Sequence, residues 1–459
     1  MKRFLPFVFP FLPLISLAQS VSQKLQKAFQ QFETDSQLKH AISSLYVIDA
    51  KTGQMVFDKN AQVGLAPAST QKIITSVTAF ELLGKDYRYK TELGVLPGKT
   101  INSIYMKPSG DPTFGSWRWN STTESIILND IINSFKPHSK NINSTIYINQ
   151  KGWDTQRIPD GWIWQDLANY YGAGAGLLNW RENQFDLILK SGAKIGDRVE
   201  VVSINPDLYL YKINSWATAA KAGSGDNAYI YFPISGYQGI VTGTIPTNEN
   251  KFKISGTMPD PNNQFIETIR DTLFGKEKPY NYLSALFLND NPETNPEIYY
   301  THYSPSLDSI IYWLNKKSIN LYGEALIKTF AYEKQGFGST DSGVAIVKKF
   351  WNEKGLDEDE LNIYDGSGLS PLNRVTTHAQ VEILKYAKTK DWFPYFLKSL
   401  PDYNGMTMKS GTISDVKGFC GYHKAKDGKE YIFSFLVNNY SGKTSGVVNK
   451  MYKVLDELK

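Results

Sequence analysis

The two ends of the chain carry the same kinds of elements, strands beside a helix, around a long central stretch of different character. Near the N-terminus, residues 44–49 and 54–58 form two predicted strands, and apolar residues at helical spacing follow until Gly84. Near the C-terminus, residues 431–438 form an apolar strand, and an amphipathic helix follows. Residues 89–282 are rich in Asn, Asp, Gly and β-forming residues. The pattern predicts that both ends join in one domain, into which the middle is inserted.

The first residues have the pattern of an export signal. Lys2 and Arg3 precede an apolar run over residues 4–15, and Ser16-Leu17-Ala18 matches a cleavage site, so the mature chain should begin near Gln19. A permanent anchor is the alternative, but the run is shorter than the roughly 20 residues that span a bilayer. We therefore expect a protein secreted into the periplasm or cell envelope, with no stable membrane span in the mature chain.

Composition excludes several classes of function. The net charge of +5 is small for this length, so nucleic-acid binding is not expected. Cys420 is the only cysteine, so no disulfide can form within the chain, and its apolar surroundings favour a buried structural thiol. The five histidines are scattered and form no H-E-x-x-H motif, so neither a metal nor a cofactor is predicted. The sequence also lacks a G-x-S-x-G motif, which argues against an α/β-hydrolase.

Ser69-Thr70-Gln71-Lys72 is the first candidate for catalysis. On a helix, residues i and i+3 lie on one face, so the Lys72 amine can reach the Ser69 hydroxyl and take its proton. The amine must be neutral for this, and burial or a nearby cation lowers its pKa. A helix cap with an exposed lysine explains the pattern as well, and S-x-x-K recurs at Ser36-Lys39, Ser191-Lys194 and Ser414-Lys417.

Two further polar motifs follow in the second half of the chain. Ser318-Ile319-Asn320 lies between two predicted helices, where the serine can relay a proton to a leaving amine and the asparagine can hold a substrate backbone. Lys409-Ser410-Gly411-Thr412 is typical of an edge strand whose lysine and hydroxyl groups bind a carboxylate. Gly411 would let the substrate backbone come close. Taken singly, a helix–helix turn and a solvated edge strand are the simpler interpretations.

The three motifs in this order resemble the signature S-x-x-K, S-D-N and K-T-G of active-serine penicillin-recognising enzymes. The gap from Ser69 to Ser318 is far longer than in β-lactamases. A large insertion there is characteristic of the D-alanyl-D-alanine carboxypeptidase/endopeptidase family, the low-molecular-mass class C penicillin-binding proteins. Ile319 stands where this family often has Asp, and Ser410 where it usually has Thr, which leaves rate and substrate preference open. Four further segments resemble the family: 110–113 (G-D-P-T), 162–166 (W-I-W-Q-D), 169–173 (N-Y-Y-G-A) and 365–375 (D-G-S-G-L-S…N-R-V).

The resemblance implies a mixed α/β (α+β) fold, in which a penicillin-binding transpeptidase-like domain places an antiparallel sheet between helices. We expect residues 1–18 to be the signal peptide, and residues 20–90 plus 284–459 to form the catalytic domain. The large insertion between the first and second motifs would hold two domains. Residues 91–100 plus 180–283 would form a β-rich domain, and residues 101–179 a second domain nested within it.

The resemblance also implies a two-step acyl transfer on peptidoglycan stem peptides and cross-links. Ser69, deprotonated by Lys72, would attack the carbonyl of a D-alanyl residue, and backbone N–H groups of Ser69 and Thr412 would stabilise the oxyanion. Ser318 and Lys72 would pass a proton to the leaving amine, and water would then hydrolyse the acyl-enzyme. β-Lactams should acylate the same serine as covalent inhibitors. The substrate would be held by Lys409, Ser410 and Thr412 at its terminal carboxylate and by Asn320 at its backbone.

Several alternatives stay open from the sequence. Asp166 can meet the free amine of diaminopimelate in a stem peptide, although a structural cap is the simpler interpretation. A β-lactamase or a transpeptidase would share the motifs, and a catalytically silent wall-binding protein would carry broken ones, whereas here the key groups are intact. Release of D-alanine would make the enzyme a carboxypeptidase, and cleavage of a cross-link an endopeptidase. The sequence does not decide between them, nor does it determine the oligomeric state.

Overall fold

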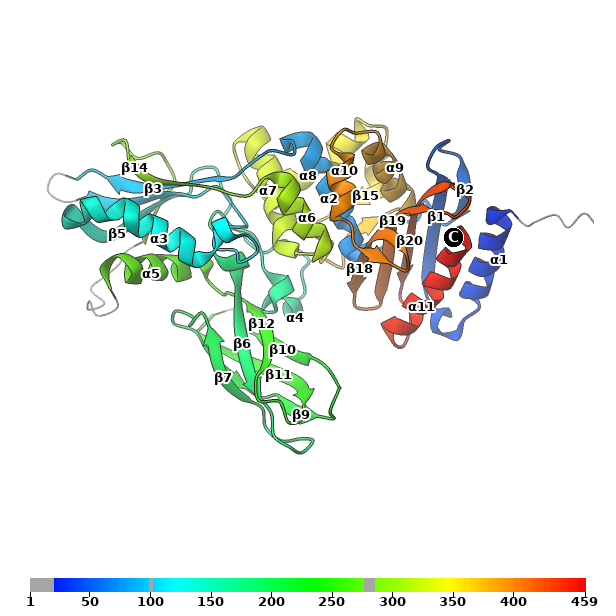
Figure 1. Cartoon of the computed structure of the whole chain (residues 1–459), viewed down its shortest axis with the longest axis horizontal. Helices are drawn as coiled ribbons and strands as arrows, with labels where there is room; N and C mark the ends of the chain where they lie inside the picture. The colour runs from blue at the N-terminus through cyan, green and yellow to red at the C-terminus, as the bar shows by residue number, and fades with distance from the viewer. Residues whose placement is uncertain (1–19, 99–101, 234, 276–284) are drawn as a thin grey trace, which may run out of the picture.

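The computed structural model of the chain describes residues 20–98, 102–233, 235–275 and 285–459. The predicted signal peptide, residues 1–18, lies outside these residues. Figure 1 shows a sheet between layers of helices at one end of the molecule and a large inserted region at the other. Among the described residues, no helix is long and apolar enough to cross a membrane.

A six-stranded antiparallel sheet joins the two ends of the chain. Strand β1 pairs with β20 along its whole length, from Ile42 opposite Asn438 to Asp49 opposite Tyr431. This pairing confirms that both ends build one domain, and the mixed α/β fold with an antiparallel sheet between helices is confirmed as well. The strand order is β17 (Asp402–Tyr403), β18 (Met406–Ile413), β19 (Val416–Lys424), β20 (Glu430–Asn438), β1 (Ile42–Asp49) and β2 (Met55–Lys59).

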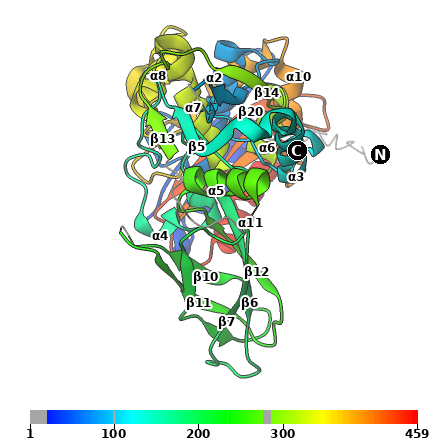
Figure 2. The ribbon, with the colours of Figure 1, turned by 90° about the vertical axis from the view of Figure 1, so that its left-hand side faces the viewer.

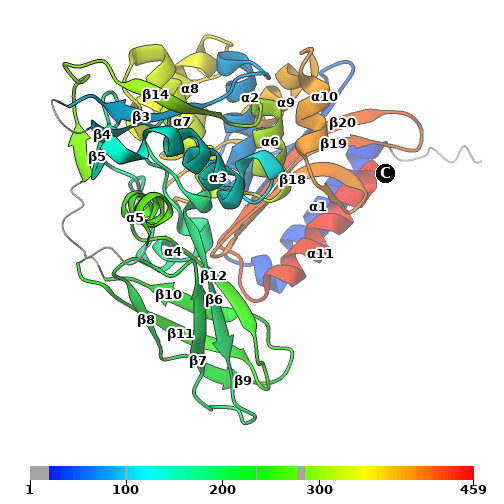
Figure 3. The same ribbon diagram turned by 60° about the vertical axis from the view of Figure 1, so that its left-hand side comes forward.

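Helices cover both faces of this sheet. The terminal helices α1 (Val21–Glu33) and α11 (Thr444–Leu455) lie side by side on one face (Figure 3), where Phe29 and Met451 are buried. The other face packs against α9 (Thr377–Lys388) and, beyond it, α2 (Lys72–Leu83). The same layer contains α6 (Leu307–Lys316), α7 (Asn320–Gln335), α8 (Thr340–Asn352), α10 (Phe393–Ser399) and the strand pair β15 (Leu361–Asn362) and β16 (Arg374–Val375).

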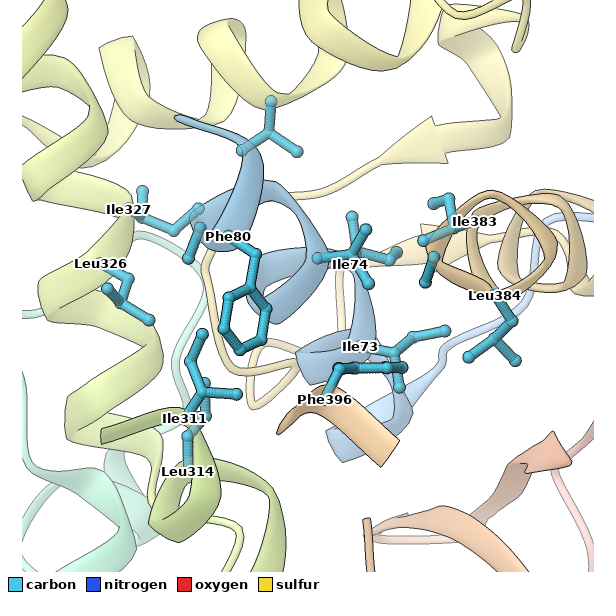
Figure 4. Packing of buried hydrophobic residues seen from close by; sticks show 14 of the residues in the cluster. Ile73, Ile74, Phe80, Ile311, Leu314, Leu326, Ile327, Ile383, Leu384 and Phe396 are labelled. Atoms are coloured by element: carbon cyan, nitrogen blue, oxygen red, sulfur yellow. The ribbon is translucent and has the colours of Figure 1, made fainter. Parts of the chain in front are cut away.

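Helix α2 lies at the centre of the larger hydrophobic core. Every residue from Lys72 to Phe80 is buried, including the polar side chains of Thr75, Ser76 and Thr78. Figure 4 shows its side chains packed among those of α6, α7, α9 and α10. The motif at the start of α2 is therefore held by a close-packed framework rather than by a loop. The labelled residues are Ile73, Ile74, Phe80, Ile311, Leu314, Leu326, Ile327, Ile383, Leu384 and Phe396.

The inserted region contains a five-stranded sheet. Its strand order is β13 (Ala285–Leu288), β5 (Ile142–Asn149), β4 (Asn102–Lys107), β3 (Lys90–Leu96) and β14 (Glu297–Tyr303). Helices α3 (Glu124–Phe135) and α5 (Pro261–Phe274) lie beside this sheet (Figure 2), and they bury Ile131 and Ile269 in a shared core.

A second part of the inserted region is rich in short strands and extends away from the rest of the molecule (Figure 1). A connector made of α4 (Trp164–Leu167) and the 3₁₀ turn η5 (Tyr170–Gly172) contacts these strands on one side and α7 on the other. One small sheet is ordered β12 (Phe252–Thr257), β6 (Gln184–Lys190) and β7 (Glu200–Asn205). The other is ordered β10 (Asn227–Tyr231), β11 (Gln238–Pro246) and β8 (Lys212–Ser215), with β9 (Thr218–Ala220) also on β11.

Strand pairing groups the inserted segments differently from the predicted boundaries. The prediction separated residues 91–100 from 101–179, yet β3 and β4 pair in one sheet. It also began the second catalytic segment at residue 284, whereas β13 and β14 complete the inserted sheet. The nesting is therefore reversed, because the β-rich segment of β6 to β12 lies within the segment that builds the five-stranded sheet. Strand propensity identifies strands, but tertiary packing selects their partners across long connections.

Candidate active site

Ser69 and Lys72 meet at the start of α2. Ser69 lies in the 3₁₀ turn η2 (Ala68–Gln71), which leads directly into the helix. The Lys72 ammonium Nζ lies 2.9 Å from Ser69 Oγ and donates a hydrogen bond to it. Lys72 is fully buried, whereas Ser69 is partly exposed. The spacing of the first motif thus places base and hydroxyl in contact, as predicted.

Two glycines allow the turn around Ser69 to pack tightly. A side chain at Gly368 would place its Cβ 1.9 Å from the carbonyl oxygen of Ala68, which itself has a left-handed φ of 45°. A Cβ at Gly411 would lie 2.8 Å from the backbone nitrogen of Ser69. The sequence predicts that Gly411 makes room for substrate, and this stays a prediction. In the structure Gly411 also makes room for the chain's own turn, which lies against β18.

Lys72 is surrounded by acceptors in a buried environment. Its Nζ also donates to Asn320 Oδ1 at 2.6 Å and to the carbonyl oxygen of Ser367 at 2.7 Å. Burial lowers the pKa of Lys72 to about 7, although the nearby carboxylates of Asp365 and Glu324 oppose this shift. Burial also raises the pKa of Glu324. An amine with a pKa near neutrality can accept the proton of a serine hydroxyl at physiological pH.

The Asp365 carboxylate stabilises the loop that contains Ser367, whose carbonyl oxygen accepts a hydrogen bond from Lys72. Asp365 is fully buried, and both of its oxygens accept hydrogen bonds. One donor, the indole of Trp162, comes from the inserted region, so the same carboxylate joins that region to the catalytic core. The other donors to Asp365 are the side chains of Gln71 and Asn373 and the backbone N–H groups of Gly368 and Ser370.

Replacing Asp365 by alanine should destabilise the protein strongly. The substitution leaves five buried donors without their acceptor, and we expect the free energy of unfolding to fall by about 3 kcal/mol or more. Urea unfolding monitored by tryptophan fluorescence measures this change. Asp86→Ala, at a largely exposed carboxylate, is the matched control, and we expect it to stay within about 0.5 kcal/mol of wild type. An Asp365→Ala protein as stable as this control would contradict the structural role of the carboxylate.

Ser318 lies in the turn between α6 and α7, with a left-handed φ of 57°. Lys409 Nζ donates to Ser318 Oγ at 2.9 Å and to the carbonyl oxygen of Ser410 at 2.8 Å. Lys409 is buried, and desolvation together with the nearby Lys72 ammonium lowers its pKa. The sequence predicts that Lys409 binds the substrate carboxylate, and this stays a prediction. In the structure its ammonium contacts the Ser318 hydroxyl.

An open cavity of about 380 Å³ lies in front of these groups. The catalytic core and the inserted region both line it. Lys409, Ser410 and Gly411 are not among the lining residues, whereas Thr412 is. The cavity is lined by Ser69, Ile163, Gln165, Asp166, Tyr170, Tyr171, Tyr229, Lys317, Ser318, Asn320, Leu369, Pro371, Thr412, Ile413 and Ser414.

Asn320 connects the catalytic core with the inserted region at this cavity, which Asp166 also lines. Burial raises the pKa of Asp166, and a hydrogen bond from the Tyr171 hydroxyl opposes the shift. Asn320 Nδ2 donates to the carbonyl oxygen of Tyr171 at 2.7 Å, which turns Asn320 Oδ1 toward Lys72. Asn320 was predicted to hold the substrate backbone. Here its carboxamide also orients the lysine.

Sequence reasoning missed three groups at this site. Glu324 lies one helical turn after Asn320 on α7, and this i,i+4 spacing is the signal that could have pointed to it. Tyr229 reaches the cavity from β10 in the β-rich segment, and no local pattern indicates this. Lys417 donates to Thr412 Oγ1, but the S-x-x-K pattern that contains it recurs in the chain and does not single it out. Cys420 is buried, as expected, and burial raises the pKa of its thiol.

Known proteins resemble the chain over most of its length. The family model of the D-Ala-D-Ala carboxypeptidase 3 (S13) family matches residues 25–402. A D-alanyl-D-alanine carboxypeptidase of Actinomadura sp. (strain R39) is 25% identical over 477 aligned residues, covering 94% of this chain and 86% of that protein.

Solved structures share the fold. The crystal structure of penicillin-binding protein 4 from Haemophilus influenzae has a TM-score of 0.78 at 18% identity, covering 94% of this chain and 98% of that one. The same protein complexed with a novel β-lactam has a TM-score of 0.71 at 17% identity, with the same coverage. Since the family model spans most of the sequence, the chain belongs to the D-Ala-D-Ala carboxypeptidase 3 (S13) family.

Proposed function

We propose that the protein is a serine DD-peptidase of the bacterial cell envelope that cleaves D-alanyl bonds in peptidoglycan stem peptides and cross-links. The observation that carries this proposal is the contact between Ser69 Oγ and the buried Lys72 amine, whose pKa is about 7. The Actinomadura relative is named a D-alanyl-D-alanine carboxypeptidase, which supports the same substrate class. The export-signal pattern supports the location, and the mature chain would begin near Gln19.

The first chemical step would form an acyl-enzyme. Lys72 takes the proton of Ser69 as the serine oxygen bonds to the D-alanyl carbonyl carbon, and the carbonyl oxygen becomes an oxyanion. The backbone N–H groups of Ser69 and Thr412 would stabilise that charge. The bond to the leaving amine then breaks, and the amine takes a proton from Lys72 through the hydroxyl of Ser318. Lys409 supports this relay, because its donation to Ser318 Oγ leaves the hydroxyl proton free to be passed on.

The second step would be hydrolysis, in which water replaces the leaving amine and Ser69 regains its proton. Strand β18 offers a docking edge for the peptide. Strand β17 pairs only with Met406 and Thr407, so among the described residues the rest of β18 has no strand on that side. An extended substrate can add there as a further strand, with Ser410 and Thr412 near its terminal carboxylate.

Product analysis tests the proposed function. The enzyme is incubated with a monomeric pentapeptide muropeptide and with a cross-linked dimer, and products are separated by liquid chromatography and mass spectrometry. We expect D-alanine from the monomer, two monomers from the dimer, and inhibition of both reactions by benzylpenicillin. Intact substrates would overturn the proposal. Rapid multiple turnover of nitrocefin without peptide cleavage would identify a β-lactamase instead.

Asp166 would recognise the free amine of a diaminopimelate side chain. Asp166 belongs to the inserted region and lines the cavity together with residues of the catalytic core. We expect Asp166→Asn to raise KM about tenfold for a stem peptide with this free amine, because one charge-assisted hydrogen bond is lost. The same peptide with an acetylated amine is the control, and its KM should barely change. Equal effects on both peptides would show that Asp166 has only a structural role.

A further inference from the structure

We propose that Lys417 is a specificity-determining residue that acts through Thr412: it turns the Thr412 hydroxyl into a hydrogen-bond donor for the substrate's terminal carboxylate. The inference rests on the proposed function and names the group that selects a carboxylate in that cavity. Lys417 does not touch the substrate itself, so its role is one of positioning.

The register of two strands places Lys417 behind Thr412. These residues are directly opposite each other in the antiparallel pair of β18 and β19. Lys417 Nζ lies 2.9 Å from Thr412 Oγ1 and 4.6 Å from the centre of the Phe419 ring. Lys417 is buried at 8% exposure, whereas Thr412 is exposed and lines the cavity. A cation–π contact with Phe419 holds the ammonium in place.

The direction of the hydrogen bond between Lys417 and Thr412 determines what the Thr412 hydroxyl can bind. An ammonium group has three donors and no acceptor, so Thr412 Oγ1 must accept from Lys417. The hydroxyl proton of Thr412 is therefore free to point elsewhere, and the cavity is the side on which Thr412 is exposed. A substrate carboxylate accepts such a proton, whereas a neutral amide carries a competing donor group. The buried ammonium adds a positive charge behind the hydroxyl.

Lys409 does not already supply this function. Its Nζ is engaged by Ser318 Oγ and by the carbonyl oxygen of Ser410, and it does not line the cavity. Desolvation lowers the pKa of Lys409, and the nearby charges of Lys72 and Lys417 lower it further. Of these two lysines of the β18–β19 pair, Lys417 is therefore the one that contacts a cavity-lining hydroxyl.

The charge of Lys417 depends on pH near the physiological range. Burial lowers the pKa of Lys417 to about 8, so the ammonium is present below this pH and is lost above it. A neutral amine can accept from Thr412, which would reverse the hydrogen bond and withdraw the donor from the cavity. Lys409 on β18 is close enough for the two lysine charges to repel each other, and Tyr403 and Tyr452 contact the neighbouring Phe419. Asp415 lies two residues away in the β18–β19 turn.

A pair of substrates tests the proposal. One peptide ends in D-Ala-D-Ala with a free carboxylate, and the other is its C-terminal amide. For Lys417→Met we expect KM for the carboxylate peptide to rise about tenfold with kcat within about twofold, and KM for the amide to stay the same. Lys417→Arg should restore the low KM, since arginine keeps the charge and donors. Lys424→Met, at an exposed lysine on the same strand, is the matched control.

The pH profile adds a second readout that a merely structural role would not change. In wild type, KM for the carboxylate peptide should rise as the pH increases through about 8, and in Lys417→Arg it should stay flat. Equal losses of Lys417→Met on both peptides, or an unchanged KM on both, would overturn the proposal. Failure of the proposed function is distinguishable, because wild type would then cleave neither peptide.

Discussion

Replacing Ser69 by alanine should lower kcat for D-alanine release by at least about 10⁴-fold, as expected when a catalytic nucleophile is removed from a cooperating set of groups. Ser69 Oγ is the hydroxyl in contact with the buried amine of Lys72 and exposed to the cavity. Ser318 also lines the cavity, but its hydroxyl accepts from Lys409 rather than from Lys72. The change is measured as initial rates of D-alanine release at saturating substrate.

The Ser69→Ala protein should keep its fold, because the substitution removes one partly exposed hydroxyl from η2. Its thermal midpoint should match that of wild type, which separates loss of chemistry from loss of structure. Ser414→Ala serves as a control, because Ser414 lines the same cavity but has no role in the proposed chemistry. A Ser69→Ala enzyme with more than a few per cent of wild-type kcat would contradict the assignment of the nucleophile.

Lys72→Met should slow acylation by about 10³-fold, the range expected for removal of a general base. Methionine fills similar space but cannot accept a proton. In wild type, the acylation rate should rise about tenfold per pH unit below about 7 and level off above it, because only the neutral amine acts as base. In Lys72→Met this dependence should disappear. Stopped-flow measurement of acylation by a chromogenic β-lactam at several pH values records both effects.

A second variant distinguishes the charge of Lys72 from its basicity. Lys72→Arg keeps a cation near Asp365 and Glu324, but the guanidinium does not lose its proton at these pH values. We expect it to be as slow as Lys72→Met. If Lys72→Arg acylated at the wild-type rate, Lys72 would act by charge alone, and its role as a base would be wrong.

Much of the fold and the first contacts of the site could be predicted from local patterns. The strand and helix at each end of the chain predicted one domain, and β1 indeed pairs with β20. The i,i+3 spacing of Ser69 and Lys72 predicted their contact, because helical geometry alone determines it. The order of the motifs predicted that Ser318 and Asn320 would join them, and both line the same cavity.

Other features depend on contacts between distant segments, which no local pattern reveals. The predicted inserted domains separated β3 from β4, because similar strand composition does not identify pairing partners. Asp365 holds donors from η2, its own loop and Trp162, so its role exists only in the folded chain. Lys409 contacts the Ser318 hydroxyl, whereas Lys417 contacts the Thr412 hydroxyl. The sequence alone cannot show which hydroxyl each ammonium contacts.

Intact-protein mass spectrometry with benzylpenicillin is the most direct test of an acyl-enzyme on Ser69. The account predicts that wild type gains the mass of one penicilloyl group, and that peptide mapping places it on Ser69. The Ser69→Ala protein should gain no mass under the same conditions. An adduct on any other residue, or equal labelling of wild type and Ser69→Ala, would contradict the account.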